Sequence, residues 1–271
     1  MQIARANNRL VLHDNGKYFE VMGATDEYGF GVGSVLGRLD TIERGEEIEP
    51  PQVLQAPFPC PTQIFAVGLN YKNHAAEMDL PLPVTPMVFA KFPSCIADPN
   101  ADVTIPGDTT DWEAELVIVV GRNGRNIPAS EAFSYIAGYM VGQDVSERTV
   151  QMSSSPAQFS MGKSFENFAP MGPWFTSSDE IENPNDLLIQ CSLNGELMQN
   201  ESTEDMAFHV PEIVAFISAV CELRAGDLIF TGSPAGVGQG QTPKRFLKDG
   251  DVLTTSIEKL GTITNTFRQA R

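Results

Sequence analysis

The sequence contains neither a long apolar run nor closely spaced cysteines. Although 42% of its 271 residues are hydrophobic, no stretch approaches the roughly 20 apolar residues that a membrane-spanning helix needs, so we expect a soluble protein. The four cysteines form no C-x-x-C pair and lie far apart, at Cys60, Cys95, Cys191 and Cys221. This spacing excludes the usual zinc and thiol-redox motifs, and we expect free, buried thiols.

Positive charge is scarce as well. The 18 lysine and arginine residues face 35 aspartates and glutamates, which gives a net charge of −17 at pH 7. Such a charge repels nucleic acids and anionic membranes, and we expect neither as a partner. An anionic substrate would need a local positive site within the protein. The N-terminus also lacks the continuous apolar segment of an export signal, so we expect a cytoplasmic location.

The length and the placement of prolines indicate two domains. A chain of 271 residues exceeds the usual size of one compact core. Residues 1–55 alternate short apolar stretches with Gly, Asn and Asp, which predicts small strands and turns, with an acidic loop from Glu43 to Glu49. Three prolines in the segment 56–62 then suppress regular structure. We therefore expect a small β-rich N-terminal domain (1–60) and a larger domain (61–271).

The larger domain shows mainly strand patterns. Runs that are rich in Val, Ile, Phe and Thr recur from Gln63 to Phe267, bounded by Gly, Pro, Asn or Asp. Helical patterns are fewer and cover residues 72–78, 130–137 and 209–223, the last with Pro211 in its first turn. These patterns predict a mainly β (α+β) fold with an antiparallel or mixed sheet.

Three acidic residues precede and enter one of the most apolar of these strands. Asp111, Glu113 and Glu115 are spaced two residues apart, so their side chains share one face of a strand. Like charges on one face of a core strand are destabilising unless a cation compensates them or the face is exposed, and the spacing alone leaves both explanations open. A second apolar strand ends at Asp144. Carboxylates at neighbouring strand ends are typical ligands of Mg²⁺ or Mn²⁺.

A histidine–glutamate pair and a glycine-rich segment are further candidates. His74 and Glu77 lie on one face of the helix predicted at 72–78, where a lone histidine would usually be structural or solvated. The glycine-rich segment 231–240 lacks the G-K-[ST] ending of a phosphate-binding loop, so we expect no nucleotide there. Its glycines indicate instead that backbone approaches a ligand closely.

Six segments together carry a resemblance to a known family. Each is weak evidence alone, but they occur in one order at suitable spacing: GLNYKNHAAEM (68–78), DWEAELVIVVG (111–121), GYMVGQDVSER (138–148), MGKSFENFAPMGP (161–173), LNGELMQ (193–199) and GDLIFTGSPAGVG (226–238). From about residue 62 to 271 the chain resembles the fumarylacetoacetate hydrolase superfamily, and within it the acylpyruvate and diketo-deoxy-aldonate hydrolases. The resemblance implies a mixed β-sandwich roll for the larger domain, and a homodimer.

The resemblance also implies roles for individual residues. The implied ligands of a Mg²⁺ or Mn²⁺ ion are Glu113, Glu115 and Asp144. This leaves Asp111 outside the metal site, in a supporting or loop role. The implied catalytic residues are His74 and Glu77, which activate water, and Lys163, which stabilises an enolate. The implied substrate contacts are Tyr71, Arg148, Thr231 and Gly232.

The expected reaction is hydrolysis of a carbon–carbon bond in a small 2,4-diketo acid, of the acylpyruvate or 2,4-diketo-3-deoxy-aldonate type, to a carboxylate and pyruvate or a related keto acid. Two alternatives use the same residues without attack by water: oxaloacetate decarboxylation and isomerisation of a 2-oxo-ene-dioate. A third alternative is a metal-binding protein without turnover. The histidine–glutamate pair argues against the third, because a protein that only binds metal needs no water-activating pair.

Overall fold

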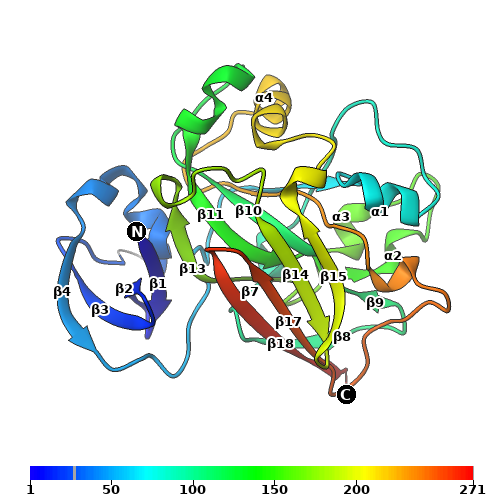
Figure 1. Ribbon diagram of the computed structural model, residues 1–271, viewed down its shortest axis with the longest axis horizontal. Coiled ribbons are helices and arrows are strands. Elements are labelled where there is room, and N and C mark those ends of the chain that lie inside the picture. Colours follow the sequence, from blue (N-terminus) through cyan, green and yellow to red (C-terminus); the bar gives the residue numbers. More distant parts are fainter. Residues whose placement is uncertain (27–28, 271) are drawn as a thin grey trace.

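Two β-sheets form the framework of the molecule (Figure 1). The computed structural model describes residues 1–26 and 29–270. Within these residues the large sheet has eleven strands, which pair in the order β4 (Glu43–Ile48), β3 (Lys17–Met22), β2 (Arg9–Asp14), β1 (Gln2–Ala6), β13 (Ala169–Ser177), β11 (Ile136–Gln143), β10 (Ala114–Val120), β16 (Leu228–Phe230), β5 (Ile64–Gly68) and β6 (Met87–Ala90), with β7 (Ile96–Ala97) paired to β13.

A second, five-stranded sheet packs against the middle of the large one. Its strands pair in the order β15 (Glu196–Ser202), β14 (Leu188–Leu193), β17 (Val252–Ile257), β18 (Gly261–Gln269) and β8 (Asp102–Ile105). Strands β14 and β17 alternate buried and less buried residues, because one face meets the large sheet and the other meets solvent. A small separate pair joins β9 (Thr110–Asp111) to β12 (Ser146–Glu147).

Helices are short and lie outside the sheets. The α-helices are α1 (Lys72–Glu77), α2 (Arg148–Gln151), α3 (Phe159–Gly162) and α4 (Val210–Val220). The 3₁₀ turns are η2 (Gly31–Ser34), η3 (Leu36–Thr41), η4 (Pro93–Cys95), η5 (Ala129–Tyr135), η6 (Ser178–Glu180), η7 (Thr203–Asp205) and η8 (Gly238–Gly240). In the described part of the chain no helix is both long enough and apolar enough to span a bilayer.

The central strand β10 carries Glu115 into the core of the molecule. All seven of its residues, AELVIVV, are buried, because strands and loops cover both faces of the sheet at this point. Each large apolar side chain that is buried in this way contributes ~1.5–3 kcal/mol to folding. The strand pairs are mostly antiparallel, but β16 and β5 are parallel. The predicted mainly β (α+β) fold with mixed sheets is therefore confirmed.

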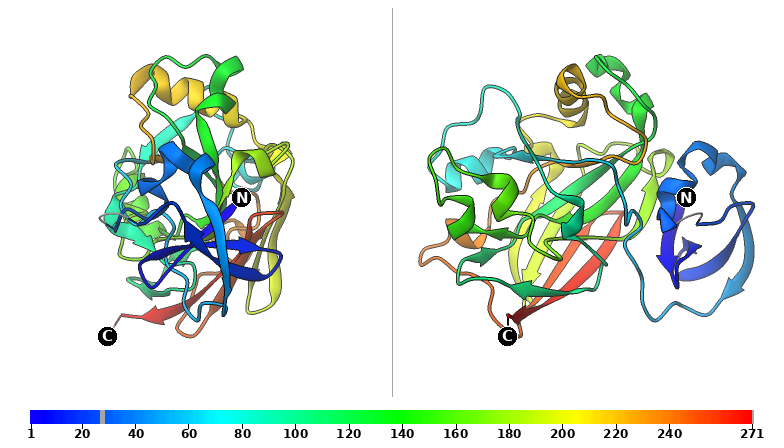
Figure 2. Two further views of the ribbon diagram at one scale, coloured as in Figure 1. Left: turned by 90° about the vertical axis from the view of Figure 1, so that its left-hand side faces the viewer. Right: turned by 180° about the vertical axis from the view of Figure 1, so that it is seen from behind.

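The N-terminal strands form a lobe at one side of the molecule (Figures 1 and 2). Strand β1 pairs with β13, with Gln2 opposite Thr176, so β1–β4 extend the large sheet rather than form a sheet of their own. The segment 56–62 has no helix or strand, as its prolines predict. The division into domains at residue 60 stays a prediction.

Three details of the sequence-based expectation are wrong. The acidic loop predicted at Glu43–Glu49 is largely strand β4, whose exposed glutamates form a charged edge of the sheet, a feature that opposes pairing with other chains. The helix predicted at 130–137 is the 3₁₀ turn η5, which ends where β11 begins at Ile136. All four cysteines are free as expected, but Cys60 is exposed and Cys221 is only partly buried.

Candidate active site

The three carboxylates predicted as metal ligands meet at the ends of two central strands. Strands β10 and β11 are antiparallel, with Ala114 opposite Gln143. The backbone N–H of Asp144 donates to the carbonyl of Glu113 at 2.9 Å, which fixes the two acidic residues side by side. Glu113, Glu115 and Asp144 are all buried, and one carboxylate oxygen from each lies within 4.8 Å of the others. An exposed acidic face is therefore excluded.

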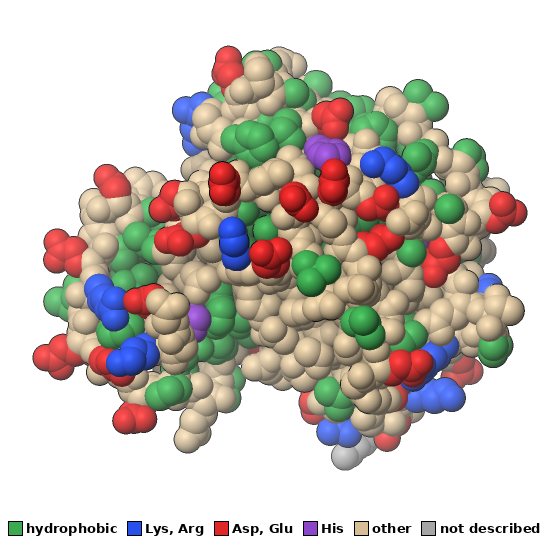
Figure 3. Space-filling model, in the orientation of Figure 1, with side chains coloured by type: hydrophobic (Ala, Val, Ile, Leu, Met, Phe, Trp, Pro, Cys, Tyr) green, Lys and Arg blue, Asp and Glu red, His purple; other side chains and the backbone are tan. Residues whose placement is uncertain are grey.

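Three buried cations surround these carboxylates. Lys163 Nζ lies 2.5 Å from Glu113 Oε2 and 2.7 Å from Asp144 Oδ2. Arg148 Nη1 lies 2.7 Å from Glu113 Oε1, and Lys91 Nζ donates to Asp144 Oδ1 at 2.6 Å. Acidic side chains are spread over the visible surface of the molecule in Figure 3, whereas this positive charge lies inside. Two of these cations, Arg148 and Lys163, line the cavity, although carboxylates compensate their charge.

The pKa values of Glu113 and Glu115 are shifted in opposite directions. Burial alone would raise the pKa of Glu113, but Lys163 and Arg148 outweigh it and lower this pKa to about 2. Burial, together with the negative charges of Asp144 and Glu113, raises the pKa of Glu115 well above its ordinary value. The backbone N–H of Gly232 donates to Glu115 Oε2 at 2.7 Å, which only partly offsets this effect.

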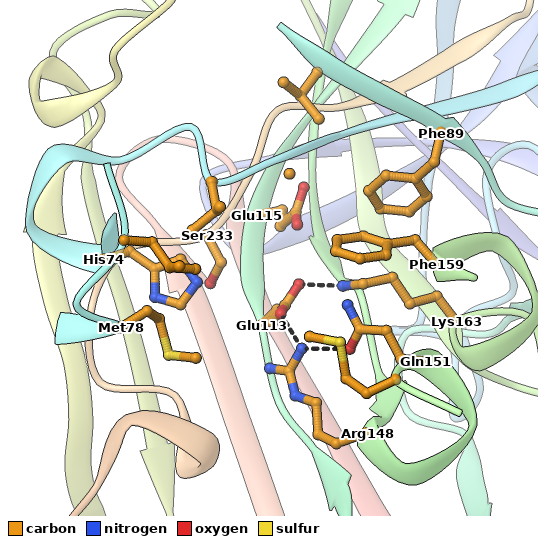
Figure 4. A pocket seen from close by; sticks show the side chains of 15 residues that line it. His74, Met78, Phe89, Glu113, Glu115, Arg148, Gln151, Phe159, Lys163 and Ser233 are labelled. Carbon is orange, nitrogen blue, oxygen red and sulfur yellow. Dashed lines mark hydrogen bonds and ion pairs between the residues drawn. The ribbon is translucent and has the colours of Figure 1, made fainter. Parts of the chain in front are cut away.

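The pair of His74 and Glu77 lies on α1, across a small cavity from Lys163 (Figure 4). His74 Nδ1 is 3.1 Å from Glu77 Oε2, and the other carboxylate oxygen of Glu77 accepts a hydrogen bond from Gly236 N at 3.0 Å. When Nδ1 carries the proton for Glu77, Nε2 is left as an acceptor. This arrangement suits a general base.

The cavity encloses about 70 Å³, enough for several waters or a small ligand. Its polar lining comes from both sides of the site: His74, Glu113, Glu115, Arg148, Gln151, Lys163 and Ser233. Its apolar lining includes Met78, Leu80, Phe89, Met152 and Phe159. Two of the predicted metal ligands, Glu113 and Glu115, therefore face the same cavity as His74.

The glycine-rich segment 231–240 supports the site through its backbone. Its N–H groups donate to Glu115 from Gly232, to Glu77 from Gly236, and to Asp111 from Gly238 and Gln239. Gly232 has φ +98°, and an added Cβ would lie 2.7 Å from Asn70 Cβ, so only glycine fits there. The backbone of the loop thus holds three carboxylates in place, and Ser233 of the same loop lines the cavity.

Three predicted substrate contacts do not line the cavity in this structure. Thr231 is buried, and its hydroxyl donates to Leu116 O at 2.9 Å, while the N–H of Gly232 is taken by Glu115. Tyr71 is fully buried, and its hydroxyl has no hydrogen-bond partner among the residues that the structure describes. Arg148 does line the cavity, although it also pairs with Asp111 at 2.7 Å. Asp111 thus supports Arg148 from outside the metal site.

Sequence patterns did not indicate three residues around the site: Lys91, Gln151 and Ser233. Lys91 is 1% exposed and donates to Asp144 and to the carbonyls of Lys163 and Phe168. In the sequence, Lys91 is a lysine at the end of an apolar strand, a position that is ordinarily exposed, so nothing marked it as a site residue. Gln151 Oε1 accepts from Arg148 at 3.0 Å, and only the fold places it in the cavity.

Comparison with known proteins gives matches along most of the chain. The family signature described as "Fumarylacetoacetate (FAA) hydrolase C-terminal" matches residues 63–268. A 2,4-didehydro-3-deoxy-L-rhamnonate hydrolase from Sphingomonas sp. (strain SKA58) is 43% identical over 203 residues, which cover 74% of this chain and 71% of the relative. The mitochondrial oxaloacetate tautomerase FAHD2B from Bos taurus is 40% identical over 212 residues, which cover 78% of this chain and 68% of the relative.

Solved structures share the fold along the entire chain. A structure from Mycobacterium smegmatis has a TM-score of 0.93 and 39% identity, and covers 100% of both chains. The maleylpyruvate hydrolase from Sphingobium sp. SYK-6, crystallised with a manganese(II) ion and pyruvate, has a TM-score of 0.79 and 26% identity, with the same coverage. The arrangement of strands around the three carboxylates therefore belongs to an established fold.

Proposed function

This chain belongs to the fumarylacetoacetate hydrolase family, whose members are enzymes that act on keto acids, and from this premise we propose a specific reaction. The proposed enzyme is a divalent-metal-dependent hydrolase. It cleaves a carbon–carbon bond in a small 2,4-diketo acid and releases a carboxylate and pyruvate or a related keto acid. One observation carries the proposal: Glu113 and Glu115 of a buried carboxylate triad line the same cavity as His74, which is hydrogen-bonded to Glu77.

The residues present fit a hard divalent cation. Three carboxylates with ligand oxygens within 4.8 Å of one another supply the oxygen donors that Mg²⁺ and Mn²⁺ prefer. Glu113, Glu115 and Asp144 would hold the ion, and the maleylpyruvate hydrolase of the same fold contains manganese(II). When bound, such an ion supplies Lewis-acid stabilisation of negative charge on the keto oxygen.

The side chains around the triad divide the remaining work. His74 takes a proton from water, with Glu77 holding the imidazole in the required tautomer, and the water oxygen adds to the distal carbonyl. The bond between that carbonyl carbon and the neighbouring carbon then breaks, and its electron pair remains with the pyruvate part as an enolate. Lys163, which lines the cavity, stabilises the enolate oxygen, and protonation at carbon completes the product.

The apolar part of the cavity bears on the substrate class. Met78, Leu80, Phe89, Met152 and Phe159 would surround the end of the substrate that leaves as the carboxylate. Apolar side chains suit a short acyl group better than the hydroxylated chain of a sugar acid, whose hydroxyl groups would lose water without partners. Among the diketo acids, we therefore propose acylpyruvates ahead of diketo-deoxy-aldonates.

A second candidate is oxaloacetate tautomerisation or decarboxylation, which the name of the Bos taurus relative favours. His74 and Lys163 lie on opposite sides of the cavity (Figure 4), where proton transfer to or from an oxo acid needs no attack by water. An assay with acylpyruvates, a diketo-deoxy-aldonate and oxaloacetate separates the two. If acylpyruvates are inert at every metal concentration while oxaloacetate reacts, the hydrolase proposal is rejected.

Removal of divalent cations is expected to abolish turnover and to lower thermal stability. A ligand that binds only the folded state stabilises it in proportion to the logarithm of its concentration over its Kd, about 2.7 kcal/mol at a hundredfold excess. The protein should therefore unfold at a lower temperature after treatment with EDTA, and addition of Mg²⁺ or Mn²⁺ should restore both properties. Full activity in excess EDTA would contradict the proposed metal dependence.

Metal binding is expected to release a proton. The raised pKa of Glu115 means that this carboxyl keeps its proton to a higher pH than an ordinary glutamate, whereas Glu113, with a pKa of about 2, has none to lose at neutral pH. A cation needs the carboxylate form, so its affinity should fall as the pH decreases through the raised pKa. Calorimetry in two buffers of different ionisation enthalpy measures the release, and identical heats in both would contradict it.

We propose that the protein acts as a homodimer in the cytoplasm, with a small keto acid as its substrate and neither nucleic acid nor membrane as a partner. The net charge of −17 supports the exclusion of anionic partners. Size-exclusion chromatography with light scattering tests the assembly.

A further inference from the structure

Gln199 on β15 makes three hydrogen bonds beneath the active site. Its side chain is fully buried. Gln199 Oε1 accepts from the backbone N–H of Ala114 at 3.0 Å. Gln199 Nε2 donates to the carbonyl of Pro234 and to the hydroxyl of Ser233, both at 2.8 Å. One side chain therefore links the strand that carries Glu113 and Glu115 to the loop that follows β16.

The orientation of this amide is fixed by its backbone partners. A backbone N–H only donates and a backbone carbonyl only accepts. Gln199 Oε1 must therefore face Ala114, and Nε2 must face Pro234. A flipped amide would place a donor against a donor and an acceptor against an acceptor, at a cost for two buried groups. Ser233 Oγ consequently receives a hydrogen from Gln199.

This polarity determines what Ser233 can offer to a ligand. A hydroxyl has a single proton, and the lone pair that faces Gln199 is already in use. Ser233 is 3% exposed and lines the cavity, and among the described residues its hydroxyl donates to no protein group. Figure 4 shows Ser233 next to His74, at the side of the cavity opposite Lys163. The proton of Ser233 is therefore available to the cavity.

We propose that Gln199 is a positioning residue that makes Ser233 a hydrogen-bond donor toward an anionic oxygen of the bound oxo acid. This inference rests on the proposed function, because it assumes that an oxo acid occupies the cavity. A carboxylate or enolate oxygen only accepts, so a serine held as a donor matches it and a serine held as an acceptor would repel it. Gln199 acts through Ser233 and does not itself line the cavity.

Gln143 provides a matched control within the same strand region. It is also a fully buried glutamine, and its Oε1 accepts from the backbone N–H of Glu113 at 2.9 Å, next to the bond that Gln199 makes to Ala114. Its Nε2, however, donates to Thr255 Oγ1 at 2.7 Å and to the thiol of Cys191, neither of which lines the cavity. Replacing Gln143 removes the same kind of support for the ligand strand without changing the polarity of Ser233.

The test measures binding of oxalate, a non-reacting oxo-acid analogue, at saturating Mn²⁺ by calorimetry. The proteins are the wild type, Ser233→Ala, Gln199→Met, the double variant, Gln143→Met, and Gln143→Met with Ser233→Ala. Ser233→Ala should lower the oxalate affinity on the order of tenfold, the effect of one hydrogen bond to a charged oxygen. Gln199→Met should give a similar loss, and the double variant should lose little more than either single variant.

The outcomes separate positioning from support of the strand. In the variant that combines Gln143→Met with Ser233→Ala, the fold losses of oxalate affinity of the two single variants should multiply, because Gln143 acts independently of the Ser233 hydroxyl. If the losses of Gln199→Met and Ser233→Ala also multiply, Gln199 is only a support and the inference is overturned. Unchanged oxalate affinity in Ser233→Ala overturns it as well. If Gln199→Met does not fold, Gln199→Glu replaces it, since that side chain keeps the acceptor for Ala114 but cannot donate to both Pro234 and Ser233.

Failure of the proposed function gives a different result. A wild-type protein that binds neither Mn²⁺ nor oxalate would overturn both the proposed function and this inference. A wild-type protein that binds both, combined with multiplying losses in the Gln199 cycle, would leave the proposed function standing and overturn the inference alone. Thermal unfolding of each variant without ligand shows whether a loss of affinity reflects a loss of fold.

Discussion

Glu113→Gln is expected to abolish tight binding of Mg²⁺ or Mn²⁺ and to reduce turnover on the order of a thousandfold or more, because Lewis-acid stabilisation accounts for several kcal/mol of the barrier. The substitution preserves the size of the side chain but removes one of three ligand charges. It also leaves the buried cations Lys163 and Arg148, which both contact this carboxylate, with less compensation. Calorimetry with Mn²⁺ and a steady-state assay on the best substrate measure the two effects.

The matched control is Glu147→Gln. Glu147 is also buried, and its carboxylate accepts a hydrogen bond from Thr110 Oγ1 at 2.8 Å, but it does not line the cavity. This variant should retain Mn²⁺ affinity within a few-fold of the wild type and should remain active. If Glu113→Gln retains turnover while Glu147→Gln loses it, the metal site has been assigned to the wrong carboxylates.

The strands around the site could be predicted because each is a continuous run of apolar residues, which is visible in the local sequence. The segment 114–120 is apolar at nearly every position, and Asp144 ends the next apolar run, so the sequence indicates where two core strands meet acidic residues. The antiparallel register that sets Glu113 beside Asp144 depends on contacts distant in sequence. The spacing of the acids alone left an exposed face open as an explanation, and only their burial in the fold excludes it.

The supporting residues could not be predicted because their roles depend on partners far along the chain. Gln199 lies 85 residues from Ala114, and Lys91 lies 53 residues from Asp144. A glutamine in a strand and a lysine at a strand end are ordinarily exposed, so neither residue stands out in the sequence. Burial changes their role, since a buried polar group must find a partner, and here the partners are the backbone of β10 and the carboxylate of Asp144.

The charge pattern shows the same limit of local reasoning. The glutamates between 43 and 49 suggested a solvated loop, but an edge strand also presents exposed side chains on both sides, so β4 satisfies the same composition. Conversely, the net charge of −17 concealed a buried group of three cations, Lys91, Arg148 and Lys163. The net charge determines the long-range electrostatic field of the protein. The electrostatic field at the site depends instead on the ion pairs around Asp144 and Glu113.

His74→Asn is expected to lower kcat for hydrolysis by roughly 10²- to 10⁴-fold, the usual contribution of a positioned general base. Asparagine cannot accept a proton at neutral pH. The variant also lacks the imidazole that Glu77 holds in position, with His74 Nδ1 3.1 Å from Glu77 Oε2. Neither His74 nor Glu77 belongs to the carboxylate triad, so Mn²⁺ and oxalate should still bind with nearly wild-type affinity. His209→Asn is the control, because His209 does not line the cavity, and it should leave kcat unchanged.

The same variant discriminates between the two proposed reactions. Hydrolysis needs a base to activate water, whereas decarboxylation of oxaloacetate needs only stabilisation of the enolate, for which Lys163 and the metal ligands remain in place. His74→Asn should therefore suppress acylpyruvate hydrolysis far more than any oxaloacetate decarboxylation that the wild type shows. Equal losses for both substrates would mean that His74 transfers a proton to or from the oxo acid itself, and the tautomerase would then become the better description of the site.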